Sequence, residues 1–215
     1  NSGVGGTSMK IILAKSAGFC FGVRRAVEEA ERLLEQSDET IDTYGELIHN
    51  PQEIARLKEK GLVPVASVDE VKSPKVVIRT HGAGRDEIEQ LTQKGAEIVD
   101  LTCPYVKKIH NIANKNCQMG VKTVIIGNGH HPEVIGIRGW CGGNSAVVSE
   151  KEDVSREIRP GERLCIVAQT TIDRKMWDEL TQEILKICPD AELCDTICSA
   201  TRERQEERSE EHTSE

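Results

Sequence analysis

Cysteines are the residues of this chain best suited to chemistry. Eight occur among 215 residues, and we expect free thiols that bind metal or do redox work rather than disulfides, because the chain lacks the cysteine density of a small stapled scaffold. Three of the cysteines share one local sequence pattern, in which an apolar segment is followed by a short loop, the cysteine and a helical pattern. They are Cys20, Cys103 and Cys198. The others are interpreted as buried small hydrophobes: Cys117, Cys141, Cys165, Cys188 and Cys194.

The shared setting of Cys20, Cys103 and Cys198 favours the thiolate. A loop that follows a parallel strand lies at the carboxyl edge of the sheet, where α/β proteins place their ligands. The positive end of a helix dipole stabilises a thiolate, which is the form that binds metal. Three thiolates on one centre would leave a coordination position open. No CxxC pair is present, so a metal centre and unconnected structural thiols both remain open.

Four further loops also follow apolar segments and precede helical patterns. They contribute the imidazoles of His49, His81 and His131 and the hydroxyl of Thr170. Imidazoles beside free helix N-termini are suited to binding a phosphate or diphosphate. One such histidine alone is more typical of a helix cap, but the repetition favours a site. Glu133 could deliver a proton there, the alternative being an ordinary acid that stabilises its helix dipole.

Alternating apolar runs and helical patterns predict the elements that position these residues. We expect strands over 10–14, 75–79, 97–101, 121–126, 146–148 and 164–168. We expect helices over 23–36, 51–60, 86–94, from 104 onward, over 132–138 and over 174–187. This order predicts an α/β fold with parallel sheets flanked by helices. Residues 202–215 are highly charged and indicate a solvated helix or a disordered tail.

The composition argues against two classes of partner. The net charge of −8 and the pI near 5.4 lack the basic footprint that nucleic acids require. No apolar run approaches the roughly 18 residues of a membrane span, so we expect no membrane and a cytoplasmic protein. Aromatic residues make up only 3% of the chain, which predicts an aliphatic core.

Seven short motifs together resemble the 4-hydroxy-3-methylbut-2-enyl diphosphate reductase family, which catalyses the last step of the non-mevalonate isoprenoid route. They are Gly18-Phe19-Cys20-Phe21-Gly22-Val23, Ile48-His49-Asn50, Thr80-His81-Gly82, Asp100-Leu101-Thr102-Cys103-Pro104, His131-Pro132-Glu133-Val134, Gln169-Thr170-Thr171, and Thr196-Ile197-Cys198 with Ala200-Thr201. The resemblance runs from about Met9 to about Gln205 in the family's order and spacing.

The resemblance implies repeated α/β units in a pseudo-threefold arrangement around a [4Fe-4S] cluster. Its ligands would be Cys20, Cys103 and Cys198, with the fourth iron open to the substrate hydroxyl. His49, His81 and His131 match the residues lining the substrate and diphosphate pocket, Thr170 matches a threonine of the proton network, and Glu133 matches the proton-delivering acid. The implied reaction reduces and dehydrates a small allylic diphosphate to isopentenyl and dimethylallyl diphosphates. A ferredoxin- or flavodoxin-like donor would supply the electrons.

The resemblance also implies a domain organisation. We expect a non-native or disordered leader over 1–8 and a first α/β unit over 9–102, whose N-terminal strand is shared with the third unit. A second unit follows over 103–197. Residues 198–215 would be the start of a truncated third unit followed by an unrelated acidic tail. We therefore expect weak or no activity from this chain and an exposed, oxygen-sensitive cluster.

Three other interpretations remain. One is another three-cysteine cluster enzyme, such as a quinolinate synthase-like dehydratase, against which the motifs around Glu133 and Thr170 argue. A second is a non-catalytic metal-binding module with structural cysteines. A third is an enzyme with a single reactive thiol as its nucleophile.

Overall fold

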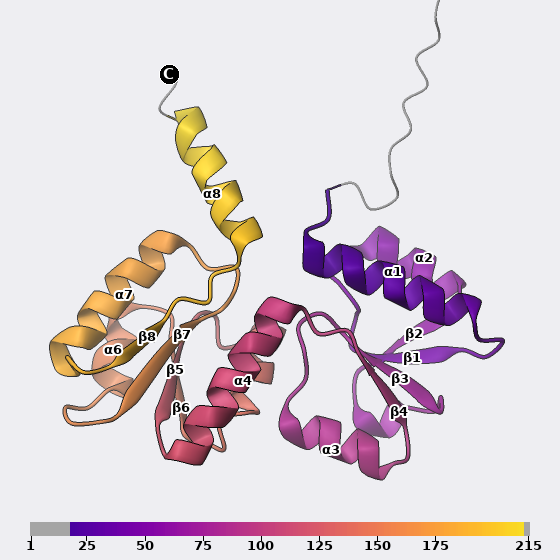
Figure 1. Ribbon diagram of the computed structural model, residues 1–215, viewed down its shortest axis with the longest axis horizontal. Helices are drawn as coiled ribbons and strands as arrows, with labels where there is room; N and C mark the ends of the chain where they lie inside the picture. The colour runs from indigo at the N-terminus through magenta and orange to yellow at the C-terminus, as the bar shows by residue number, and fades with distance from the viewer. Residues whose placement is uncertain (1–17, 213–215) are drawn as a thin grey trace, which may run out of the picture.

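Two parallel four-stranded sheets form the framework of the protein (Figure 1). The computed structural model describes residues 18–212. The first sheet contains β1 (Ile41–Tyr44), β2 (Leu62–Val65), β3 (Lys75–Ile78) and β4 (Glu97–Asp100), in the order β2-β1-β3-β4. The second contains β5 (Lys122–Ile126), β6 (Ser145–Val148), β7 (Leu164–Ala168) and β8 (Glu192–Cys194), in the order β6-β5-β7-β8. The same topology therefore occurs twice, which confirms the predicted α/β class.

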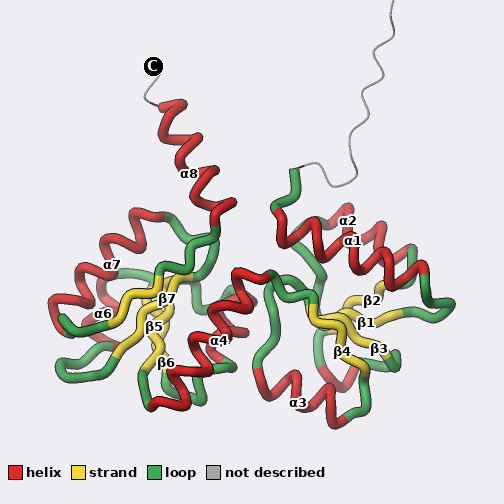
Figure 2. Tube along the Cα trace, in the orientation of Figure 1, coloured by secondary structure: helices red, strands yellow, loops and turns green. Residues whose placement is uncertain are grey.

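Helices cover both faces of each sheet, as Figure 2 shows. On the first sheet, α1 (Phe21–Glu35) and α2 (Pro51–Glu59) pack on one face and α3 (Arg85–Gln93) on the other. On the second, α6 (Lys151–Glu157) and α7 (Arg174–Ile187) pack on one face, with α4 (Pro104–Met119) and α5 (Pro132–Arg138) on the other. A short 3-10 helix, Val68–Glu70, and α8 (Ser199–His212) complete the described elements.

Alternate side chains of the central strands supply the two cores of each sheet. Val77 packs beneath α1 and α2, whereas Val76 and Ile78 face α3. In the second sheet, Ile125 faces α4 and α5 while Val124 packs on the α7 side. Burial on both faces is the reason that strands of parallel sheets read as continuous apolar runs.

The strands β1 and β2 and the helix α6 were not predicted. In β1 the buried residues include Asp42 and Thr43, which break the apolar pattern. Asp42 is accommodated because its carboxylate accepts the backbone N–H groups of Lys72 and Ser73 at 2.7 and 2.8 Å. The charged tail was predicted to be either a solvated helix or a disordered segment, and its described part forms the helix α8. The expected leader over 1–8 and strand over 10–14 lie outside the described residues.

Local signals start the helices that carry the site. Pro51, Pro104 and Pro132 each open a helix, where a missing N–H costs nothing. The Asn50 side chain accepts the N–H of Glu53 at 3.0 Å and so caps α2.

Among the described residues, no helix combines the length and the apolar character needed to cross a bilayer.

Candidate functional site

The structure brings the three predicted cysteines to one cavity. Cys20 occupies the N-cap position of α1, Cys103 occupies that of α4, and Cys198 directly precedes α8. Figure 1 shows these three helices starting near one another at the centre of the molecule. All three cysteines line a cavity of about 150 Å³, called here the three-cysteine pocket. Residues far apart in sequence thus present thiols to one small volume.

A turn built on Asp100 holds Cys103. The Asp100 carboxylate accepts the N–H of Thr102 at 3.0 Å and pairs with Lys107 at 2.5 Å. Burial alone would raise the pKa of Asp100, but hydrogen bonds from Lys107 and Thr102 outweigh it and hold that pKa below its usual range. The backbone N–H of Cys103 donates to the carbonyl of Thr80 at 3.0 Å, which ties the cysteine to the end of β3.

The same arrangement recurs at Cys198. Asp195 accepts the N–H of Ile197 at 3.3 Å and lies 3.4 Å from the Arg202 guanidinium. The N–H of Cys198 donates to the carbonyl of Thr170 at 3.0 Å, after the end of β7. At both cysteines an aspartate lies three residues before the cysteine, and a lysine or arginine lies four residues after it. The supporting role of these acids and bases was not predicted, although the shared Asp-x-x-Cys-x-x-x-Lys/Arg spacing could have identified it.

The thiol of Cys103 does not have the lowered pKa expected at a helix N-terminus. Burial raises its pKa, and the neighbouring thiols of Cys20 and Cys198 raise it further. The N–H groups of Tyr105 and Val106 act in the predicted direction but are outweighed. A cationic centre in the pocket would instead lower the pKa of the Cys103 thiol, because a positive charge favours the thiolate form of a nearby cysteine. Three convergent sulfur donors suit iron or zinc.

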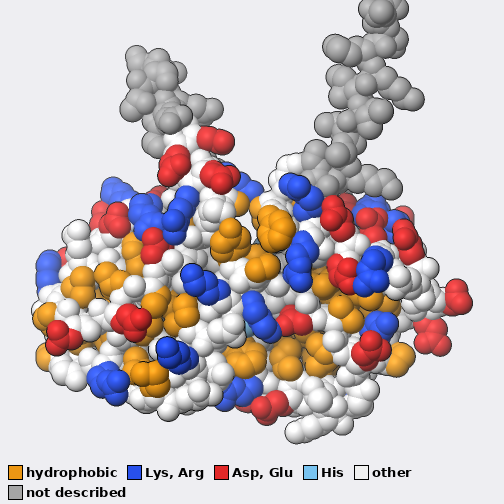
Figure 3. All heavy atoms as spheres, in the orientation of Figure 1, with side chains coloured by type: hydrophobic (Ala, Val, Ile, Leu, Met, Phe, Trp, Pro, Cys, Tyr) orange, Lys and Arg blue, Asp and Glu red, His pale blue; other side chains and the backbone are white. Residues whose placement is uncertain are grey.

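Close packing and an apolar rim surround the pocket. A methyl group on Gly22 would stand 2.5 Å from Cys103 Sγ, so glycine permits the approach of α1. Tyr105 and Ser199 share a hydrogen bond of 2.8 Å that joins α4 to α8. Phe21 and Tyr105 also line the pocket, and their side chains are 62% and 39% exposed. Hydrophobic side chains gather between the bases of α1 and α8 in Figure 3.

The three predicted histidines form a second cluster. His49 follows β1, His81 follows β3 and His131 caps α5. Their ring centroids are separated by 4.3 Å (His49 to His81), 5.8 Å (His49 to His131) and 5.5 Å (His81 to His131). One nitrogen from each lies within 4.8 Å of the others, close enough to hold a metal ion. Neutral imidazoles can equally donate N–H groups to an anion.

Burial disfavours the protonated form of two of these histidines. It lowers the pKa of His81 to about 3, with further contributions from His49, Arg79 and His131. It also lowers the pKa of His131. Both shifts disfavour the positively charged form of these two imidazoles. The cation beside them is Arg79, which was not predicted as a site residue; burial lowers the pKa of its guanidinium too.

Glu133 and Thr170 meet at the edge of the three-cysteine pocket. Glu133 is only 3% exposed, and its carboxylate accepts the backbone N–H of Thr170 at 2.6 Å and its hydroxyl at 2.8 Å. Burial raises the pKa of Glu133, while these two hydrogen bonds oppose the rise. Both residues line the pocket together with His81. A buried acid with a raised pKa is suited to hold a proton and to release it during a reaction.

Comparisons with known proteins agree on one family. A family model described as "LytB protein" matches residues 11–214, whereas we expected the resemblance to end near Gln205. A protein from Caldanaerobacter subterraneus subsp. tengcongensis named 4-hydroxy-3-methylbut-2-enyl diphosphate reductase is 42% identical over 203 residues. One from Alkaliphilus oremlandii with the same name is 44% identical over 198 residues. Each alignment covers 92% of this chain, and 70% and 71% of the respective relatives.

Solved structures show the same fold. The E-1-hydroxy-2-methyl-but-2-enyl-4-diphosphate reductase from Plasmodium falciparum superposes with a TM-score of 0.84 at 27% identity. That match covers 87% of this chain and 60% of the other. A second structure, titled as (E)-4-hydroxy-3-methyl-but-2-enyl diphosphate reductase, the terminal enzyme of the non-mevalonate pathway, gives a TM-score of 0.78 at 40% identity. It is matched over 91% of this chain and 70% of its own length.

Proposed function

Because this chain belongs to the LytB protein family, we propose that it reduces and dehydrates (E)-4-hydroxy-3-methylbut-2-enyl diphosphate. The products would be isopentenyl and dimethylallyl diphosphates. The observation that carries the proposal is the convergence of Cys20, Cys103 and Cys198 on the cavity that Glu133 and Thr170 also line. The balanced reaction consumes two electrons and two protons and releases one water. We propose a ferredoxin- or flavodoxin-like protein as the electron donor.

The three cysteines would hold a [4Fe-4S] cluster. Three sulfur donors fit such a cluster with one iron left open. The pKa of the Cys103 thiol is raised in the pocket, and a cationic centre bound there would lower it. When bound, the cluster supplies electrons and a Lewis-acidic position for the substrate oxygen. The Asp100–Lys107 pair and its counterpart at Asp195 would hold the cysteine loops in place.

The diphosphate would bind at the histidine cluster. The rings of His49, His81 and His131 lie together. His49 directly precedes the N-cap residue of α2 and His131 is the N-cap residue of α5, so N–H groups at two helix N-termini lie beside these imidazoles. Arg79 contributes positive charge, which the neutral imidazoles lack. An anion placed among them raises the pKa of His81, so its binding would be linked to proton uptake.

Glu133 would deliver the proton that converts the substrate hydroxyl into departing water. Its carboxyl group is buried, and Thr170 donates to both of its oxygens, which fixes the orientation of the acid. Burial raises the pKa of Glu133, so a larger fraction carries the proton at neutral pH than in an exposed glutamate. General acid catalysis from such a position typically contributes about 10²–10⁴-fold.

Anaerobic purification followed by iron, sulfide and zinc analysis tests the proposal. We expect iron with matching sulfide, loss of both in Cys103→Ser, and turnover of the allylic diphosphate with a reduced viologen dye. A matched control is Cys188→Ser, which changes a buried thiol outside the three-cysteine pocket. Zinc without sulfide, and no turnover, would instead favour the non-catalytic metal-binding module.

A further inference from the structure

Two thiols outside the three-cysteine pocket lie side by side in the second sheet. Cys165 belongs to β7 and Cys194 to the neighbouring β8. In the strand register Cys165 pairs with Glu192, and Val167 pairs with Cys194. The two cysteines are therefore diagonal neighbours whose side chains share one face of the sheet. Their sulfur atoms are 3.6 Å apart.

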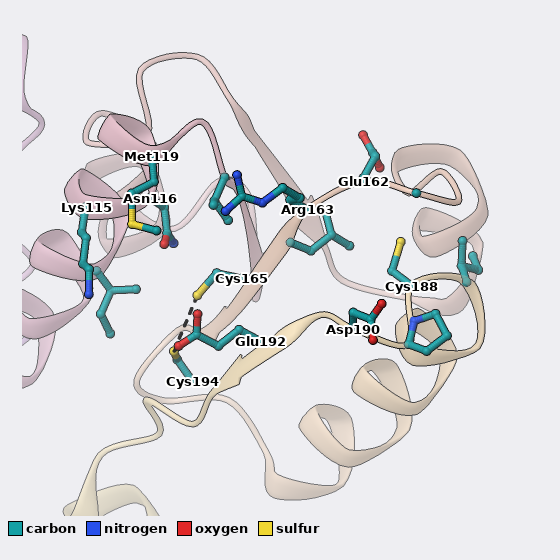
Figure 4. Close-up of a pocket in the computed structure, with 16 residues that line it drawn as sticks. Lys115, Asn116, Met119, Glu162, Arg163, Cys165, Cys188, Asp190, Glu192 and Cys194 are labelled. Carbon is teal, nitrogen blue, oxygen red and sulfur yellow. Dashed lines mark hydrogen bonds between the residues drawn. The ribbon is translucent and has the colours of Figure 1, made fainter.

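A cavity gives small molecules access to this pair. Cys165 and Cys194 line a cavity of about 470 Å³ together with Cys188 and Glu192. In Figure 4 the sulfurs of Cys165 and Cys194 point toward one another, and the Glu192 carboxylate lies beside Cys194. Cys165 is only 1% exposed, whereas Cys194 is partly exposed. A reagent in the cavity therefore reaches Cys194 first.

We propose that Cys165 and Cys194 form a reversible disulfide by exchange with a small-molecule disulfide such as oxidised glutathione. A disulfide requires about 2.0 Å between sulfurs, so the pair must close by roughly 1.5 Å. The short edge strand β8, of only three residues, can adjust more easily than the central strand β7. Cys188 lines the same cavity but donates to the carbonyl of Arg159 at 3.1 Å and has no such partner among the described thiols.

The exchange proceeds in two balanced steps. The Cys194 thiolate attacks one sulfur of oxidised glutathione, forming a mixed disulfide and releasing one glutathione thiolate. The Cys165 thiolate then attacks Cys194 Sγ, forming the protein disulfide and releasing the second glutathione. The two cysteines lose two protons and two electrons in total, and the oxidant becomes two molecules of reduced glutathione.

The protonation of Cys194 predicts how the rate depends on pH. Burial, the Cys165 thiol and the Glu192 carboxylate raise the pKa of Cys194 to about 12. Since only the thiolate attacks, the first step should be slow at neutral pH and should accelerate about tenfold per pH unit in the alkaline range. A rate that is independent of pH would show that another thiol reacts first.

The disulfide would act on the segment that leads to the three-cysteine pocket. Cys194 precedes Cys198 by four residues, and between them Thr196 accepts the N–H of Ala168 at 2.8 Å. A bond from Cys194 to β7 would restrain this segment at a second point. We expect slower amide hydrogen exchange in residues 192–198 of the oxidised protein than of the reduced protein.

Peptide mapping of the chain without substitutions tests the proposal directly. The protein is incubated with oxidised glutathione, alkylated and digested, and a crosslinked peptide pair containing Cys165 and Cys194 is expected. Treatment with dithiothreitol should restore both thiols. Alkylation of both cysteines after oxidation, or pairing of either with a different cysteine, would overturn the proposal.

Single variants test the order of the steps. Cys165→Ala should stop at the mixed disulfide on Cys194, and Cys194→Ser should leave Cys165 unmodified because that thiol is buried. Cys188→Ser is the matched control and should crosslink like the parent chain. Glutathione on Cys165 in the Cys194→Ser variant would refute the proposed order. Mapping of the parent chain requires no substitution, so poor folding of a variant does not decide the result.

Discussion

Replacing Gly22 with alanine should abolish the proposed iron binding while leaving most of the fold intact. Gly22 lies in the first turn of α1, next to Cys20. The new methyl group would stand 2.5 Å from Cys103 Sγ and 3.3 Å from Cys103 Cβ. Favourable contacts lie near 3.5–4.0 Å, so the sulfur must move by roughly 1 Å or more. Rotation of the Cys103 side chain relieves the contact but changes where its sulfur points.

The expected loss of stability is modest. Overpacking typically costs about 1–3 kcal/mol, and alanine recovers about 0.5–1 kcal/mol relative to glycine in a helix. The net loss of up to about 2.5 kcal/mol corresponds to a fall in Tm of at most roughly 10 °C for a chain of this size. The effect on iron should be larger, because a ligand displaced by roughly 1 Å no longer meets the geometry that a metal centre requires.

Anaerobic reconstitution followed by iron and sulfide analysis measures the effect, with thermal melting in parallel. Gly129→Ala is the matched control, since its new methyl would meet Val147 Cγ1 at an ordinary 3.7 Å. We expect the control to retain its iron and the Gly22→Ala variant to lose most of it. Equal iron content in the two variants would refute the reasoning that α1 must approach Cys103 this closely.

Three further predictions concern protons and the support of Cys198. Glu133→Gln should lower turnover by about 10²–10⁴-fold at unchanged iron content, measured with a reduced dye; unchanged turnover would remove Glu133 from the mechanism. Burial lowers the pKa of His81 to about 3 from its ordinary 6.5, so the unfolded chain binds the proton more readily. The contribution of neutral His81 to stability should be complete above pH 6.5 and be lost as the pH falls toward 3. In the His81→Phe variant the melting temperature should depend less on pH between 3 and 6.5. An unchanged pH profile would contradict the lowered pKa of His81. Thr196→Val should cost roughly 1–3 kcal/mol in urea unfolding, because it removes the hydroxyl bonded to the N–H and carbonyl of Ala168; a neutral effect would show that these groups find other partners.

Elements with strong local signals were predicted well. The helix α5 runs over 132–138 as expected, because Pro132 opens it and Gly139 follows its last residue. The helix α7 also has the expected bounds, since its apolar side chains recur at helical spacing. By contrast, β1 went unrecognised because Asp42 interrupts its apolar pattern. The donors that satisfy Asp42 come from about thirty residues away, at Lys72 and Ser73.

The residues of the candidate site could be named from sequence, but their charge states could not. The setting of Cys103 before Pro104 predicted a favoured thiolate, and the structure reverses the direction of its pKa shift. The sequence also could not show the protonation of His81, whose pKa burial lowers to about 3. In both cases a side chain's protonation depends on the volume and charges around it, which come from segments that are distant in sequence.

The sequence by itself determined which side chains are available and in what local setting, because turns, caps and helical periodicity depend on only a few neighbouring residues. It therefore placed Cys20, Cys103 and Cys198 at the starts of helices. Only the tertiary structure decided that the three sulfurs share one pocket with Glu133, and that Cys165 lies against Cys194. Convergence depends on the order and register of the sheets, which are set by burial and pairing between distant strands.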